Sequence, residues 1–229
     1  MWNVLQSDAS PNERIRDLTT LIETKQVNIN WQNGQDFERT ALHYAAWKGT
    51  TEIVDLLVKN GADLNCKEND GWTALHFAAR YGTTEMVQLL VKNGADLNCK
   101  QNEGWTALHL AAEYGTTEMI DLLLKKGADL NCKENKDWTA LHFAARYGTT
   151  EMVDLLVKNG ADLNCKNNNG WTALHFAAES RTTEMVDLLV KNGADLNCKQ
   201  NDGWTALKLA IECKNTEIVE LLKKHGAST

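Results

Sequence analysis

A period of 33 residues constrains this chain more than any other feature. Residues 71–82 read GWTALHFAARYG, and similar text begins at 104, 137 and 170, with weaker copies at 38 and 203. Residues 73–105 and 139–171 are identical at 30 of 33 positions. One such unit is too small to bury its own apolar side, so a fixed period of this length predicts a stack of repeated units.

Local signals divide each unit into a helix, a turn, a second helix and a loop. Thr73 is expected to cap a short helix over 74–81, because its hydroxyl accepts a hydrogen bond from a first-turn amide. Gly82 is expected to end that helix in the left-handed conformation. A second amphipathic helix is expected over about 83–92. The segment ADLNCKQNEGW that follows is rich in turn residues and predicts a loop or hairpin.

The phrase TALHFAA, the glycine after it and the closing NGADLN resemble the ankyrin repeat. The resemblance covers about residues 38–227 and implies an all-α, ankyrin-repeat solenoid of about seven units. It implies a degenerate N-terminal capping repeat and loop over 1–37, five regular repeats over 38–202 and a C-terminal capping repeat over 203–229. One departure is systematic: alanine stands at 41, 74, 107, 140, 173 and 206, where the family usually has proline.

The charge and the ends of the chain narrow the classes of partner. The net charge of −7 would repel phosphate backbones, so we expect no nucleic-acid partner. No apolar run approaches the ~18 residues that span a bilayer, and the N-terminus lacks a secretory pattern. Cysteines at 66, 99, 132, 165 and 198 recur once per repeat, too far apart for disulfides. We therefore expect a reduced, intracellular monomer in the cytoplasm or nucleus, without membrane contact.

Repeated histidines and cysteines raise the question of catalysis or metal binding. A catalytic histidine needs a nucleophile or carboxylate beside it and a pocket for substrate. A structural zinc site needs closely spaced ligand pairs, whereas Cys66, Cys99, Cys132 and Cys165 each stand ten residues before the next histidine. The resemblance instead implies that each histidine bridges backbone or threonine groups between repeats. We expect no enzyme activity, no cofactor and no metal. The histidines concerned are residues 43, 76, 109, 142 and 175.

A tryptophan precedes the capping threonine in most repeats, and two interpretations stay open. The resemblance implies that this position often faces a ligand, and tryptophan is enriched at binding hot spots. Equivalent indoles also stiffen an array by packing on neighbouring loops. The candidates for partner contact are Trp72, Trp105, Trp138 and Trp171.

The last residues of each first helix are the stronger candidates for recognition. The resemblance implies that these positions vary and point into a concave groove. Their charge alternates from residue 80 to 179, which permits pairs between repeats and suits an extended partner of mixed charge. We predict a module that binds a protein or peptide through the groove and the hairpin tips; the alternative is a structural spacer without a dedicated partner. The candidates are Trp47, Lys48, Arg80, Tyr81, Glu113, Tyr114, Arg146, Tyr147, Glu179 and Arg181.

Two replacements break the regular pattern of glycines. Asp137 stands where other repeats have a turn glycine, and Arg181 stands where the first helix should end. Both positions are expected to require a positive φ, which is uncommon for residues other than glycine.

The loops carry a possible modification pattern. L-x₅-D-x-N recurs from Leu57, Asp63 and Asn65 onward and resembles the recognition pattern of an iron-dependent asparaginyl hydroxylase. Asn98 and Asn131 are the candidates. The alternative is that the same aspartates and asparagines hold the hairpin.

Overall fold

The computed structural model describes residues 1–24 and 27–228. Within them the chain forms fourteen helices and no strand, with one isolated bridge between Asn33 and Arg39. The helices are α1 (Trp2–Leu5), α2 (Pro11–Glu23), α3 (Ala41–Trp47), α4 (Thr51–Lys59), α5 (Ala74–Tyr81), α6 (Thr84–Lys92), α7 (Ala107–Tyr114), α8 (Thr117–Lys125), α9 (Ala140–Tyr147), α10 (Thr150–Lys158), α11 (Ala173–Glu179), α12 (Thr183–Lys191), α13 (Ala206–Glu212) and α14 (Thr216–Lys224).

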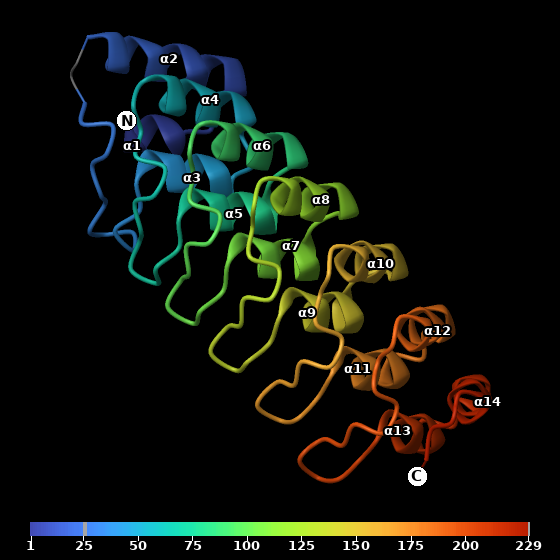
Figure 1. Ribbon diagram of the computed structural model, residues 1–229. Helices are drawn as coiled ribbons and strands as arrows, with labels where there is room; N and C mark the ends of the chain where they lie inside the picture. The colour runs from blue at the N-terminus through green and yellow to red at the C-terminus, as the bar shows by residue number, and fades with distance from the viewer. Residues whose placement is uncertain (25–26, 229) are drawn as a thin grey trace. The chain divides into compact units, whose positions relative to one another are not determined.

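The chain divides into two compact units, and the same packing recurs in each. Unit 1 comprises Met1–Ala111 and Lys125–Ala128, and unit 2 comprises Ala112–Leu124 and Asp129–Thr229. In unit 1 the odd-numbered inner helices pack as one row and the even-numbered outer helices as another, α3 against α1 and α5, α4 against α2 and α6 (Figure 1). In unit 2, α11 packs against α9 and α13, and α12 packs against α10 and α14.

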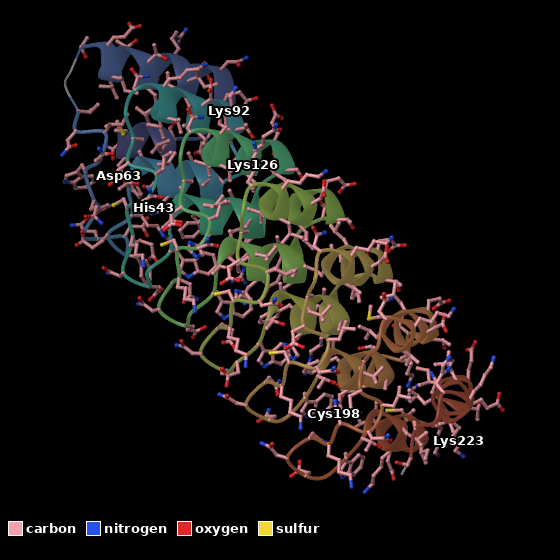
Figure 2. All side chains as sticks on the ribbon, in the orientation of Figure 1. His43, Asp63, Lys92, Lys126, Cys198 and Lys223 are labelled. Carbon is pink, nitrogen blue, oxygen red and sulfur yellow. The ribbon has the colours of Figure 1, made fainter. Side chains whose placement is uncertain are left out.

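The inner helices are short, rich in alanine and almost fully buried. In α5, the six consecutive residues Ala74–Ala79 are buried, and the small side chains of its three alanines let neighbouring helices approach closely. The outer helices bury only one face, which in α6 comprises Met86, Val87 and Leu90. Lys92, labelled in Figure 2, lies in the last turn of α6, where the helix dipole favours a cation.

The prediction that Gly82 ends α5 in the left-handed conformation is wrong. Gly82 has φ −93° and ψ −164°, which is extended backbone. Glycine is needed there because of crowding: a Cβ would lie 2.8 Å from the Ala78 oxygen and 3.0 Å from the Met86 sulfur. Gly148 repeats this arrangement after α9, against Ala144 and Met152.

Other inner helices end differently, and here positive φ does occur. After α3, α11 and α13, each one residue shorter than α5, the second residue beyond the helix is left-handed: Gly49 (φ 70°), Arg181 (φ 62°) and Lys214 (φ 56°). Arg181 therefore has the positive φ that its place in the sequence predicts. Asp137 does too, with φ 60°.

The proposed repeat boundaries fall in segments between helix pairs. Before residue 37, α1 and α2 form a helix pair that packs on α3 and α4. After residue 203, α13 and α14 form the last described pair. The limits 1–37, 38–202 and 203–229 stay a prediction; residues 25, 26 and 229 lie outside the described residues.

Candidate functional site

Each regular repeat starts its inner helix with a threonine–histidine pair. The backbone N–H of Thr73 donates to Nδ1 of His76 at 3.1 Å, and the Thr73 hydroxyl lies 2.8 Å from the same nitrogen. The pair forms a capping box, so Thr73 is the N-cap as predicted. Because Nδ1 accepts the backbone hydrogen bond, the ring proton of the neutral histidine must sit on Nε2.

The Nε2–H group then donates to a loop carbonyl farther along the chain. In His43, labelled in Figure 2, Nε2 lies 2.9 Å from the Cys66 oxygen. In His76 it lies 3.0 Å from the Trp105 oxygen, 29 residues on. The prediction that these histidines bridge threonine and backbone groups between repeats is confirmed for His76. The Cys66 carbonyl that His43 contacts lies in the loop that closes the same repeat.

Burial keeps these histidines neutral. Desolvation lowers the pKa of His43, His76 and His142 to about 4, against the pull of their carbonyl partners. His76 contacts the Thr73 hydroxyl, the Trp105 carbonyl and the Trp72 ring. Within the described residues, no three His, Cys, Asp or Glu side chains are arranged to hold a metal ion, and all six cysteines are free thiols.

The predicted tryptophans are half-buried and pack on the inner helices. The Trp138 ring centroid lies 4.9 Å from that of Phe143 in its own repeat and 4.6 Å from that of Phe176 in the next. Trp72 lies 5.0 Å from Phe77. These contacts support the stiffening role, and the exposed part of each indole leaves partner contact as a prediction. Trp171 lies 4.8 Å from Phe176, and Trp105 lies 6.3 Å from His109.

Two arginines predicted to contact a partner lie over aromatic rings. The Arg146 guanidinium carbon lies 5.3 Å from the Tyr147 ring centroid, 5.4 Å from that of Phe176 and 5.7 Å from that of Trp138. In unit 1, the Arg80 guanidinium carbon lies 5.0 Å from Tyr81 and 5.7 Å from Trp72. Such contacts favour one region of space for the guanidinium.

The pairing of opposite charges that the alternation permits does not occur between Arg146 and Glu179. Both residues are described and exposed, and no ion pair joins them. Arg146 stacks on rings instead, because exposed ion pairs contribute little free energy. The tyrosines beside these charges are exposed: Tyr81 by 47 %, Tyr114 by 46 % and Tyr147 by 52 %. Glu113 is half-buried, and Arg181 is exposed.

The C-terminal end of α3 lies at a pocket, and the sequence predicted only some of the residues that line it. Trp47 and Lys48 line a cavity of about 570 Å³ together with Trp2, Tyr44 and Arg39. The Lys48 ammonium lies 4.2 Å from the Trp47 ring centroid, and Trp2 packs on Tyr44 at 5.2 Å. The sequence carries a signal for Tyr44 that was not used: the equivalent position of the other repeats has Phe or Leu. No signal marked Trp2, which lies outside the repeated text.

A buried acceptor in each loop was also missed. Glu68 is 4 % exposed, and its Oε1 atom accepts hydrogen bonds from the Asp70 and Trp72 amides at 3.0 and 3.1 Å. Burial raises the pKa of the Glu68 carboxyl. In unit 2, Asn167 does the same for the amides of Asn169 and Trp171. Glutamate, glutamine and asparagine alternate at this position, which hid its shared role as an acceptor.

The loop asparagines hold neighbouring hairpins together. The Asn131 Oδ1 atom accepts a hydrogen bond from the Asp162 amide at 3.0 Å, and the Asn131 amide donates to Asp129 at 3.1 Å. Asn98 donates likewise to Asp96 at 2.9 Å. These bonds support the structural interpretation. Hydroxylation of Asn98 and Asn131 stays a prediction, and both side chains are exposed.

The part of the chain that is described contains no helix long and apolar enough to cross a bilayer.

Comparison with known proteins identifies the repeats. The family model "Ankyrin repeats (3 copies)" matches residues 8–101, 93–167 and 148–229. Protein phosphatase 1 regulatory subunit 12A from Mus musculus, Homo sapiens and Rattus norvegicus is 59 % identical over 34 residues. That match covers 15 % of this chain, and the chain covers 3 % of the length of these relatives. The all-α ankyrin-repeat solenoid that the TALHFAA phrase predicts is thus confirmed, and the chain belongs to the ankyrin-repeat family.

Proposed function

We propose that this chain is a non-catalytic module that binds a polypeptide through its inner-helix ends and hairpin tips. Ankyrin repeats are a general protein-interaction module. The recognition surface proposed here comprises, in unit 1, Trp47, Lys48, Arg80 and Tyr81, and in unit 2, Tyr114, Arg146, Tyr147 and Glu179. We call these two sets the inner-helix ends.

The main support for the proposal is the environment of Arg146. Its guanidinium lies over three aromatic rings and forms no ion pair among the described residues, although the chain has an excess of acidic groups. A cation placed over rings in this way loses part of its rotamer freedom before a ligand arrives, so a partner's carboxylate binds it at a reduced entropic cost. The exposed Tyr147 beside it offers a rigid apolar contact.

The charge pattern defines the partner's chemistry. Acidic side chains of a polypeptide suit Arg80, Arg146 and Lys48. A strongly acidic partner would be repelled by the net charge of −7, and a basic residue suits Glu179. These observations together favour an extended segment of mixed charge that carries acidic and apolar residues.

Selection from a displayed library of random peptides tests the proposal. The selected peptide is measured against the unchanged chain and two variants, Arg80→Ala with Tyr81→Ala in unit 1, and Arg146→Ala with Tyr147→Ala in unit 2. At least one variant should weaken binding by about tenfold or more, because hot-spot truncations commonly exceed 1.4 kcal/mol.

Matched controls replace exposed residues of the outer helices: Glu85→Ala with Gln88→Ala in unit 1, and Glu151→Ala with Glu184→Ala in unit 2. These should leave the affinity within about twofold. If the outer-helix controls lose as much affinity as the inner-helix-end variants, recognition does not depend on the inner-helix ends. Failure to select any binder, with intact folding, would favour the structural spacer instead.

A further inference from the structure

Six asparagines of this chain are followed by glycine, the sequence most prone to spontaneous deamidation. In this reaction the glycine nitrogen attacks Cγ of the asparagine side chain, the amide nitrogen leaves as ammonia, and a five-membered succinimide forms. Water then opens the ring to aspartate or isoaspartate. Glycine favours the attack because it has no Cβ to obstruct it. The six residues are Asn33, Asn60, Asn93, Asn159, Asn169 and Asn192.

Four of them end an outer helix, where the reacting atoms are held apart. Asn60 is the C-cap of α4, and its Nδ2 atom donates to the Leu56 oxygen at 2.8 Å. The Gly61 amide that would attack donates instead to the Val58 oxygen at 3.1 Å. The same pair of bonds recurs at Asn93, Asn159 and Asn192.

The backbone angle at these caps also opposes ring closure. Ring closure first requires rotation about the asparagine Cα–C bond, the angle ψ, until the glycine nitrogen lies on the same side as the asparagine Cβ. At the four caps ψ is 16°, 7°, 3° and 8°, which places that nitrogen on the side of the asparagine's own nitrogen. Reaction therefore requires the helix end to open, and with it the bond from the following alanine, such as Ala62 N to Leu57 O at 3.0 Å.

Asn33 is held as well. It is buried, its Oδ1 atom accepts from the Gln35 amide at 3.0 Å, and its own amide donates to the Arg39 oxygen at 2.9 Å.

Asn169 is different. It lies in the exposed turn between α10 and α11, and its side-chain amide has no hydrogen-bond partner within the described part of the chain. Its backbone is held by three bonds outside any helix. The Asn169 amide donates to Asn167 Oδ1 at 3.0 Å, the Gly170 amide donates to the Asn167 oxygen at 2.8 Å, and the Asn169 oxygen accepts from the Asn201 amide of the next hairpin at 3.1 Å. Opening this turn leaves both helices intact, so it requires less free energy than opening a helix end.

We propose that Asn169 is a spontaneous deamidation site of the folded protein, and that the four capping asparagines are latent sites closed by the fold. The product adds a carboxylate at a hairpin tip. Equivalent tips carry aspartate at positions 70 and 202, so the fold tolerates the new charge. Deamidation at a cap would instead remove the donor to the leucine carbonyl and place a negative charge at a helix C-terminus, which is destabilising.

Tryptic mapping of the full chain tests this assignment. The four capping asparagines all arise in one peptide sequence, NGADLNCK, from residues 60–67, 93–100, 159–166 and 192–199. Asn169 arises in NNNGWTALHFAAESR, residues 167–181. The chain is aged at mildly alkaline pH, folded or in urea, and fragment spectra then locate each new carboxyl. In the folded chain, Asn169 should convert more than about tenfold faster than the pooled caps. In urea the two rates should agree within about threefold.

Asn169→Gln is the matched control, because a glutamine would have to close a larger ring. It should abolish the mass change at that position and leave the pooled caps unchanged. The assignment is wrong if the folded chain converts the caps as fast as Asn169. It is also wrong if the tenfold preference persists in urea, since local sequence rather than folding would then be its cause.

Discussion

The Nε2 atom of His142 lies 3.0 Å from the carbonyl oxygen of Cys165, a residue of the next loop 23 positions along the chain. It also lies 3.1 Å from the Trp171 oxygen, while Nδ1 accepts from the Thr139 amide at 3.0 Å. One neutral imidazole thus joins the start of an inner helix to the loop that leads into the following repeat. A doubly protonated ring would lose the Nδ1 bond.

This arrangement predicts that acid weakens the fold. The folded pKa of about 4 for His43, His76 and His142 lies below the ordinary value of 6.5. The unfolded chain therefore binds more protons between these values, and the free energy of unfolding falls as the pH drops from about 6.5 toward 4. The loss should reach about 1 kcal/mol per histidine at about pH 5.5. Urea unfolding at neutral pH and at pH 5.5 measures it, and His142→Gln should reduce the slope. A stability that is flat across this range would contradict the buried neutral state.

Arg181→Gly should stabilise the chain by about 1 kcal/mol, because Arg181 holds a φ of 62° that glycine adopts without strain. The control is Gly49→Ala, at the equivalent position with φ 70°, which should destabilise by a similar amount. Thermal unfolding of both variants measures the effect. A lower melting temperature for Arg181→Gly would show that the arginine side chain contributes a contact worth more than the strain.

Thr182→Asn should stabilise α12. Thr182 has φ −95° and ψ 92° and makes no capping bond, whereas Asn215 has nearly the same angles and its longer side chain accepts from the Ile218 amide at 3.1 Å. Supplying this cap should add roughly 0.5–2 kcal/mol to the free energy of unfolding. The denaturant midpoints of the unchanged chain and of Thr182→Asn measure this gain. The control is Thr83→Asn, which should gain little because Thr83 already caps α6.

Ala74→Pro should raise the melting temperature. Ala74 is the first residue of α5, and the preceding Thr73 has φ −99° and ψ 169°, the extended conformation that a following proline prefers. The gain should be about 0.4–1 kcal/mol, through the reduced entropy of the unfolded chain. Calorimetry measures it, and a fall in melting temperature would mean that the ring clashes with the preceding loop.

Much of this fold follows from local rules. The repeat period, the capping threonine and the alternation of small and large apolar residues place the helices closely, and the positive φ of Asp137 follows from the glycines at equivalent positions. The extended conformation of Gly82 does not, and part of the crowding that requires glycine there comes from the Met86 sulfur of the next helix. Likewise, the stacking of Arg146 on Phe176 depends on a residue of the next repeat, so the sequence showed only a charge pattern that permits an ion pair.

The account separates constant residues, which build the stack, from the inner-helix ends, which recognise a partner. Reversing the charge of Arg80 and Arg146 together tests this most directly, through the Kd for the peptide selected on the unchanged chain. The prediction is a loss of affinity of tenfold or more, roughly 1.4 kcal/mol, with the free energy of unfolding unchanged. An unchanged Kd in a folded variant would contradict the assignment of recognition to these residues.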